Sequence, residues 1–115
     1  MDAYLPPEIK LAQALAEIDT SLAAGLSEHN AEFGELLASL YFETVAHRMI
    51  ELAQEGECEK LKAMGQLIET ALVGDPIATD MIRFGFADTI KRSGKADLVA
   101  PFIGSKLTFW IETAP

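Results

Sequence analysis

Residues 67–76, LIETALVGDP, contain the strongest local signal for structure in this sequence. A segment of helical periodicity ends at Gly74, because glycine readily adopts the left-handed conformation that closes a helix. Asp75 can then cap the next helix with its carboxylate, and Pro76 suits the first turn of that helix, where an N–H group is not needed. The stretch therefore predicts a tight connection between two helices.

The segments on both sides of this connection have apolar residues at helical spacing. Upstream, residues 57–73 are expected to form a helix that buries one apolar stripe. Downstream, residues 76–93 carry two apolar faces, so we expect a helix that is packed on two sides. The stripe consists of Leu61, Met64, Ile68 and Leu72, and the two faces consist of Met81 with Phe84 and of Ile82, Phe86 and Ile90.

The first helix is expected over residues 7–24, where the apolar positions are four, three and four residues apart. Glycines that follow helical segments are expected to close them. The apolar positions of the first helix are Leu11, Leu15, Ile18 and Leu22, and the closing glycines are Gly25, Gly56, Gly74 and Gly94.

Two further segments are expected to be helical but interrupted. Residues 30–55 would span roughly 39 Å as a single helix, so we expect a kink or break near Gly34 or around Tyr41. Residues 96–113 contain Pro101, which removes a backbone hydrogen bond from a helix interior. We therefore expect this segment to split into a short turn and a helix.

No run of residues alternates convincingly with the period of two that is typical of strands. The sequence therefore predicts an all-α fold in which residues 1–115 form a single domain. We expect a compact bundle of five to six antiparallel helices, and HEAT-like helical hairpins are one form that it can take. Glycine inside a helix lowers the stability of the helix by roughly 1 kcal/mol relative to alanine, so such glycines should mark kinks or close approaches between helices. These are Gly34, Gly65, Gly85 and Gly104.

The net charge of −9 is concentrated in the first half of the chain. Residues 1–59 contain twelve acidic and two basic side chains, whereas residues 60–115 contain six acidic and seven basic ones. Several glutamates lie three or four residues apart, where like charges on a helix repel each other. We expect a docking surface for a basic partner protein, with a solvated face that aids solubility as the alternative. The expected partner-binding residues are Glu28, Glu32, Glu35, Glu43, Glu51 and Glu55.

The sequence contains no recognisable catalytic, phosphate-binding or metal-binding motif. Glu43, His47 and Glu51 share one helical face, but roughly 12 Å of helix separates the first from the last, so one ion cannot bind all three. We expect His47 to be an exposed, ion-paired histidine and His29 to belong to a helix-capping turn. Cys58 lies between two glutamates, which disfavour a reactive thiolate. We therefore predict no enzyme activity, no cofactor and no metal site.

Apolar and basic segments are too short for a membrane span or a nucleic-acid site. The longest strongly apolar stretch, residues 36–42, is far shorter than the roughly 20 residues of a membrane span. The first residues lack the basic and apolar regions of a signal peptide. We therefore expect a cytoplasmic protein that binds neither membranes nor nucleic acid, since phosphates require more clustered bases than this chain has. The largest group of bases in the sequence consists of Arg83, Lys91, Arg92 and Lys95.

Two stretches resemble a bacterial helical family of unknown function. In that family a helix with an I-E-x-x-L pattern meets a Gly-Asp turn, and the next helix carries a Gly-Phe-x-Glu-like element. Residues 67–76 match the first pattern, and residues 81–88, MIRFGFAD, match the second with Asp88 in place of the glutamate. The same turn resembles a HEAT-type helical hairpin, and small acidic helical proteins of this kind are similar to immunity proteins that neutralise a toxin. The resemblance covers a minor part of the chain and transfers no functional residue.

Three functions follow as hypotheses. The first is a non-enzymatic protein that binds a basic partner. The resemblance to immunity proteins implies that it neutralises a toxin. The alternative is a self-associating structural or adaptor module, which allows a homo-oligomer. A third is a helical bundle that binds a small ligand between its helices. The apolar surface of the self-associating alternative would consist of Phe84, Phe102, Phe109 and Trp110.

Overall fold

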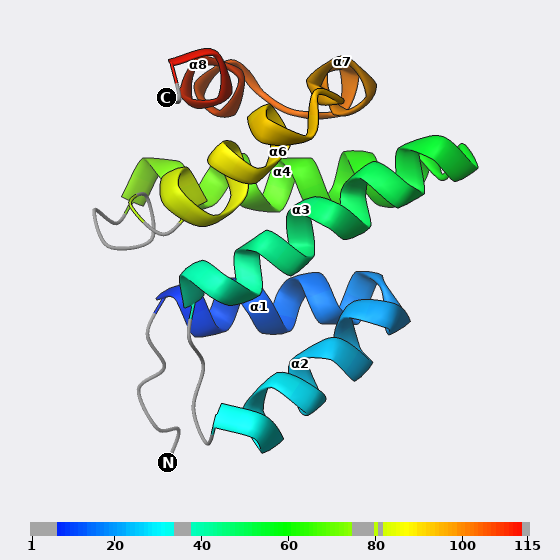
Figure 1. Cartoon of the computed structure of the whole chain (residues 1–115), viewed down its shortest axis with the longest axis vertical. Coiled ribbons are helices and arrows are strands. Elements are labelled where there is room, and N and C mark those ends of the chain that lie inside the picture. Colours follow the sequence, from blue (N-terminus) through cyan, green and yellow to red (C-terminus); the bar gives the residue numbers. More distant parts are fainter. Residues whose placement is uncertain (1–6, 34–37, 75–79, 81, 114–115) are drawn as a thin grey trace.

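Helices form all the regular elements of the residues that the structure describes (Figure 1). The computed structural model describes residues 7–33, 38–74, 80 and 82–113. The all-α prediction is confirmed for these residues, which contain seven α-helices instead of the expected five to six. In chain order the elements are α1 (Pro7–Ile18), α2 (Thr20–Phe33), α3 (Ala38–Glu55), α4 (Cys58–Gly74), the π-helical η1 (Ile82–Ala87), α6 (Asp88–Ser93), α7 (Ala96–Val99), the 3-10 turn η2 (Ala100–Phe102) and α8 (Ser105–Thr113).

The helix count is higher partly because the first expected helix is two helices. α1 ends just before Asp19 and α2 begins just after it, so residues 7–24 are not one helix. Gly25 lies inside α2 and does not close a helix, which corrects the prediction. The carboxylate of Asp19 accepts a hydrogen bond from the backbone N–H of Leu22 at 3.2 Å. A side chain that satisfies an early N–H group in this way is an N-cap and starts a new helix.

The other expected helix ends agree with the structure where it describes them. Gly56 and Gly94 have φ angles of 79° and 73°, which lie in the left-handed region. The helix α4 includes Gly74, and the residue that follows it lies outside the described residues. The expected cap Asp75 and the first-turn residue Pro76 lie outside the described residues.

The two interrupted segments are also resolved into separate helices. Residues 30–55 are divided between the end of α2 and α3, and the expected break near Gly34 falls outside the described residues. α3 continues without interruption through Tyr41, so a break at that position is wrong. The split at Pro101 is confirmed, because α7 and η2 precede α8 as separate elements.

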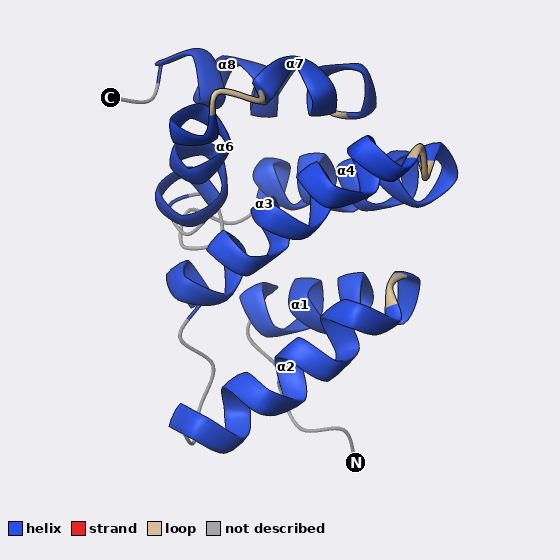
Figure 2. Ribbon diagram, turned by 45° about the vertical axis from the view of Figure 1, so that its right-hand side comes forward, coloured by secondary structure: helices blue, strands red, loops and turns tan. Residues whose placement is uncertain are grey.

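The long helix α3 is the central element of the fold. Figure 1 shows α1 and α2 on one side of α3 and α4, and α6, α7 and α8 on the other. α1 and α2 run in roughly opposite directions, as α3 and α4 do, and a short connection joins the two helices of each pair (Figure 2). α3 packs against α2, α4, η1, α6 and α7, and its inward side chains Phe42, Val45 and Met49 are fully buried. None of the described helices combines the length and apolar character that crossing a bilayer requires.

The segment after the expected connection is buried on one side only. Ile82, Phe86 and Ile90 are fully buried, as predicted, but Phe84 is 58% exposed. Phe84 lies two residues from both Ile82 and Phe86, and therefore on the opposite side of the helix. The described helices leave that side open, so the prediction of a segment packed on two sides is wrong at this residue.

The helix α4 fixes the position of the C-terminal elements. A Cβ atom added to Gly65 would collide with the backbone oxygen of Phe102 in η2, which confirms the expected close approach at this glycine. The carboxylate of Glu69 accepts hydrogen bonds from the backbone N–H groups of Lys106 at 2.9 Å and Leu107 at 3.0 Å. These donors lie in the first turn of α8, where they have no partner within the helix. Glu69 therefore caps α8 from a neighbouring helix.

Candidate functional site

The exposed side of α3 carries three of the glutamates that were expected to bind a partner. Glu43, His47, Glu51 and Glu55 each follow the previous residue by four positions, so they form a row along the helix. His47, Glu51 and Glu55 are exposed, and Glu43 is half-buried. We refer to these four residues as the acidic ridge.

Two of the three glutamates in the acidic ridge have a basic partner within the chain. Nη2 of Arg92 lies 3.7 Å from Oε1 of Glu43, and Nη1 of Arg48 lies 3.7 Å from Oε2 of Glu55. Ion pairs at this distance in contact with solvent contribute little to stability, but they reduce the charge that a partner meets. Within the described part of the chain Glu51 forms no ion pair, so it keeps its full charge at the centre of the ridge.

The other expected partner-binding residues are not placed on this ridge. Glu28 is exposed on α2, which is a different helix. Glu32 belongs to α2 but its side chain is not described, and Glu35 lies outside the described residues. The structure therefore joins half of the six expected glutamates into one surface.

A polar hollow of about 330 Å³ lies beside the acidic ridge, between α3 and α6. Glu43 and His47 line it from α3, and Thr89, Arg92 and Ser93 line it from α6. The hydroxyl groups of Thr89 and Ser93 donate hydrogen bonds of 2.7 and 2.6 Å to backbone carbonyls of the preceding turn, and hydroxyls held in this way are not nucleophiles activated by a base. The described residues contain no group of three or more His, Cys, Asp or Glu side chains that could hold a metal ion.

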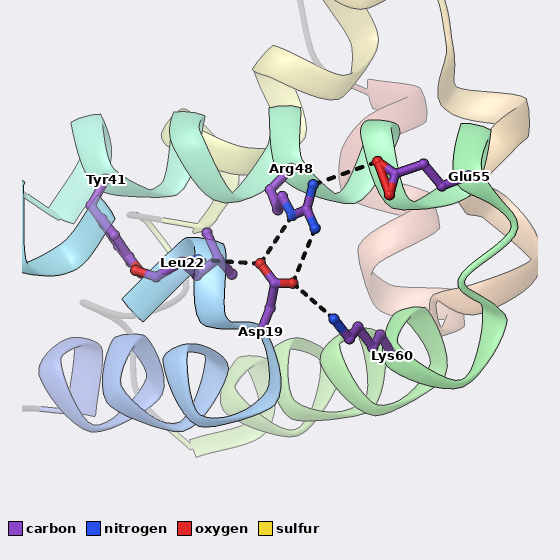
Figure 3. A network of polar contacts seen from close by, with 6 residues as sticks. All are labelled: Asp19, Leu22, Tyr41, Arg48, Glu55 and Lys60. Carbon is purple, nitrogen blue, oxygen red and sulfur yellow. Dashed lines mark hydrogen bonds and ion pairs between the residues drawn. The ribbon is translucent and has the colours of Figure 1, made fainter. Parts of the chain in front are cut away.

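A buried carboxylate connects the junction of α1 and α2 to α3 and α4 (Figure 3). Asp19 is fully buried, and its two oxygens accept hydrogen bonds from Nε and Nη2 of Arg48 at 2.9 and 3.2 Å. Its Oδ1 atom also accepts a hydrogen bond of 3.3 Å from Nζ of Lys60. A carboxylate that meets a guanidinium through two parallel hydrogen bonds forms one of the stronger pairs in proteins. We refer to Asp19, Arg48 and Lys60 as the Asp19 centre.

Sequence reasoning assigned no role to Asp19, although two signals point to it. Asp19 lies four residues after Leu15 and three before Leu22, which places its charge beside the apolar stripe of the first helical segment. A charge that is buried in this way needs a partner of opposite sign, and Arg48 and Lys10 are the two bases in residues 1–59. The spacing of 29 residues to Arg48 carries no periodic signal, so only the folded chain identifies the pair.

Two aromatic rings pack together between α2 and α3. His29 lies inside α2 and is buried, so the expected capping turn at this residue is wrong, because α2 continues past it. The rings of His29 and Tyr41 meet edge to face with centroids 5.8 Å apart. The hydroxyl of Tyr41 donates a hydrogen bond of 3.4 Å to the backbone carbonyl of Leu22. These contacts hold α2 against α3.

Tyr41 makes stability depend on pH in alkaline solution. Burial, and to a lesser degree the negative charge of Asp19, raise the pKa of the Tyr41 phenol from 10.0 to about 12. The fold thus favours the neutral phenol, and this contribution to stability is complete below pH 10 and is lost as the pH rises through about 12. We expect the urea midpoint of unfolding to fall over this range, and to fall less for Tyr41→Phe. If the urea midpoint falls equally with pH in the wild-type protein and in Tyr41→Phe, Tyr41 is not the source of this pH dependence.

A groove of about 630 Å³ lies between α1 and α4. Its lining is mostly apolar, and it includes Leu11, Ile18 and Leu67. Specific ligand sites usually combine such a lining with a few polar groups that converge on the ligand. The polar residues Lys10, Gln66 and Thr70 lie at separate positions along the two helices. The groove therefore provides room for a small ligand, but its polar groups do not converge on one point.

Three of the four aromatic residues expected on an apolar surface meet where η1 contacts α8. The rings of Phe109 and Trp110 are 5.8 Å apart in an edge-to-face arrangement. The guanidinium carbon of Arg83 lies 4.5 Å from the centroid of Trp110 and 5.7 Å from that of Phe84. Phe102 packs instead against the hydrophobic core. We refer to Arg83, Phe84, Phe109 and Trp110 as the aromatic patch.

Comparison with known proteins adds no relative to this description. No protein-family model, no curated protein and no solved structure matches the chain. The resemblance to a bacterial helical family and to immunity proteins therefore stays a prediction, and the function is inferred from the geometry of the chain.

Proposed function

We propose that this protein is a non-enzymatic binding module that docks a basic surface of a partner protein through the acidic ridge. The observation that carries this proposal is the row of Glu43, His47, Glu51 and Glu55 on the exposed side of the central helix. Like charges in such a row repel each other and lower the stability of the helix by a few tenths of a kcal/mol per pair. A basic partner relieves this repulsion when it binds, so its association is favoured by charge complementarity.

The surroundings of the acidic ridge support a docking role. Five other elements pack against α3, so the charged row is held by a rigid scaffold and loses little conformational freedom on binding. Leu40, which is 42% exposed at the start of α3, lies one turn before Glu43 and adds an apolar contact at the end of the ridge. A rigid charged surface of this kind gives fast association that is sensitive to salt.

The finer features of the proposal rest on the resemblance described above. In this proposal the partner is a basic toxin that the protein neutralises in the cytoplasm. The pairs α1–α2 and α3–α4, which run in opposite directions (Figure 1), act as HEAT-like hairpins that present the acidic ridge.

Reversing the charge of Glu51 tests the acidic ridge. Glu51 forms no ion pair among the described residues, but its negative charge acts on Arg48, so circular dichroism is used to check that Glu51→Lys is folded. We expect the association rate with the basic partner to fall by about tenfold at low salt, with a smaller dependence on ionic strength. The partner is first isolated from the native host at low salt and identified by mass spectrometry. Stopped-flow kinetics at several salt concentrations then give the rates.

Glu112→Lys is the matched control, because Glu112 is exposed on α8 and the substitution changes the net charge by the same amount. We expect its association rate to stay within about twofold of the wild-type rate at the same ionic strength. If both variants slow association equally, net charge alone is responsible and the acidic ridge is not the docking surface. If Glu51→Lys leaves the rate and its salt dependence unchanged, the proposal is wrong.

A further inference from the structure

The aromatic patch holds the two most exposed large apolar side chains among the described residues. Phe84 and Phe109 are each 58% exposed, whereas Leu40 and Leu98 are 42% and 40% exposed. A hollow of about 430 Å³ lies beside Phe109 and is also lined by Ser105, Lys106 and Trp110. Exposed aromatic side chains next to a hollow are typical of the anchor positions in protein interfaces.

Within the described part of the chain, the two bases at this patch lack acidic partners. The guanidinium carbon of Arg83 lies over the rings of Trp110 and Phe84, and a guanidinium in contact with an aromatic ring can still donate its N–H groups to a carboxylate. Among the described residues neither Arg83 nor the ammonium group of Lys106 forms an ion pair. This is unexpected in a chain with twice as many acids as bases, where Arg48 and Arg92 both have carboxylate partners.

The backbone that holds this arginine is also unusual. Arg83 and Phe84 belong to η1, a π-helical segment of six residues. Such segments are rare and occur frequently at functional sites. The segment places a base and an exposed ring side by side next to Trp110 on α8.

The charge of the patch distinguishes between its two candidate occupants. A second copy of this chain, related by a two-fold axis through the patch, would bring Arg83 and Lys106 close to their own counterparts, and like charges in an interface disfavour it. A carboxylate pairs with Arg83 through two parallel hydrogen bonds. The acids nearest in sequence to the patch are Asp80, Asp88 and Glu112, and among the described residues none of them forms an ion pair with Arg83.

We propose that the aromatic patch, together with Lys106, is a second docking surface that binds an acidic peptide segment carrying an aromatic or aliphatic side chain. The apolar side chain of the segment enters the hollow beside Phe109 and Trp110, and a carboxylate of the segment pairs with the edge of Arg83. This goes beyond the proposed role of the acidic ridge, because the two surfaces select partners of opposite charge. The protein then links a basic partner to an acidic one.

Selection from a random displayed peptide library tests this proposal without a known partner. The full chain is the target, and counter-selection uses the Arg83→Gln, Phe109→Ser double variant. We expect the enriched peptides to combine Asp or Glu with an aromatic or large aliphatic residue. Trp110 is the only tryptophan of the chain, so its fluorescence then reports binding of a synthetic copy of the enriched peptide directly at the patch.

Single variants test the charged contact of Arg83 and the apolar contact of Phe109 separately. We expect Arg83→Gln and Phe109→Ser each to weaken binding of the enriched peptide by about tenfold, which is typical of interface anchor residues. Arg92→Gln is the matched control, since it removes the same charge from an arginine that pairs with Glu43, and it should change the affinity by less than about twofold. Circular dichroism confirms that all three variants are folded.

Three results would overturn the proposal. The first is a selection that enriches no peptide, or enriches basic ones. The second is an equal loss of peptide affinity in Arg83→Gln and Arg92→Gln, which would mean that only the net charge of the protein affects binding. The third is a concentration-dependent dimer in sedimentation that Phe109→Ser dissociates, because a second copy of this chain would then cover the patch.

Discussion

Asp19→Asn is expected to lower the free energy of unfolding by about 3 kcal/mol, since removing one partner from a buried ion pair leaves the others buried without compensation. Arg48 keeps only 18% of its side chain exposed. Asparagine has one acceptor oxygen in place of two, so Arg48 would keep at most one of its two hydrogen bonds to residue 19 and would lose the opposite charge. Domains of this size are typically stable by about 5–15 kcal/mol, so the loss is a large fraction of the total. Urea unfolding followed by circular dichroism and by Trp110 fluorescence measures it.

Asp97→Asn is the matched control for this prediction. Asp97 is exposed in the first turn of α7, where a carboxylate interacts only with the helix dipole and solvent. We expect a loss below about 1 kcal/mol. A loss of similar size for both variants would mean that the Asp19 centre contributes no more to stability than an exposed carboxylate.

Acid solution provides a second check on the Asp19 centre. Burial alone would raise the pKa of the Asp19 carboxyl, but hydrogen bonds from Arg48 and Lys60 lower it by more, so the pKa lies below its ordinary value of 3.8. The fold therefore favours the carboxylate, and this contribution is complete above pH 3.8 and is lost as the pH falls through the lowered pKa. The wild-type protein should lose stability in acid more steeply than Asp19→Asn. If the free energy of unfolding falls equally in acid for both proteins, the Asp19 carboxylate is not the source of this loss.

Gly65→Ala is expected to destabilise the fold by about 2 kcal/mol, although alanine is the better helix former. The added Cβ atom would collide with the carbonyl group of Phe102, which belongs to the backbone and cannot rotate away. The cost of overpacking is typically about 1–3 kcal/mol and more where the backbone must shift. It exceeds the helix-propensity gain of about 1 kcal/mol. Thermal and urea unfolding measure the net change.

Gly25→Ala is the control with the opposite expected sign. Gly25 lies inside α2, and a Cβ atom added there meets nothing within 4 Å. We therefore expect this substitution to stabilise the protein by about 0.5–1 kcal/mol through helix propensity alone. If Gly65→Ala also stabilises the protein, η2 does not lie against α4 as described.

The helical segments and their ends were the most predictable part of the fold. The apolar stripe of residues 57–73 gave the bounds of α4 to within one residue, and the left-handed Gly56 and Gly94 ended helices where expected. These signals are local, because helical periodicity and glycine conformation depend on residues within one or two turns. The exposed row of Glu43, Glu51 and Glu55 was predictable for the same reason.

The interactions between helices were not predictable in the same way. Glu69 was noted only as part of a family-like pattern, yet its carboxylate caps α8 through residues 37 and 38 positions later. Phe84 was expected on one of two packed faces of its helix, and the self-associating alternative placed it on an exposed apolar surface. Its exposure depends on which helices cover η1, and periodicity carries no information on that arrangement.

The sequence by itself determined that this chain is helical, which residues form most of its helices, and that its acidic charge lies mainly in residues 1–59. The tertiary structure decided which charges remain exposed and which are buried. It placed Asp19 between Arg48 and Lys60 and, among the residues that the structure describes, left Glu51 without an ion pair at the centre of the acidic ridge. The physical reason is the distance along the sequence over which each interaction acts. Hydrogen bonds within a helix join residues that are close in sequence. Pairing of buried charges joins residues that only the packed helices bring together.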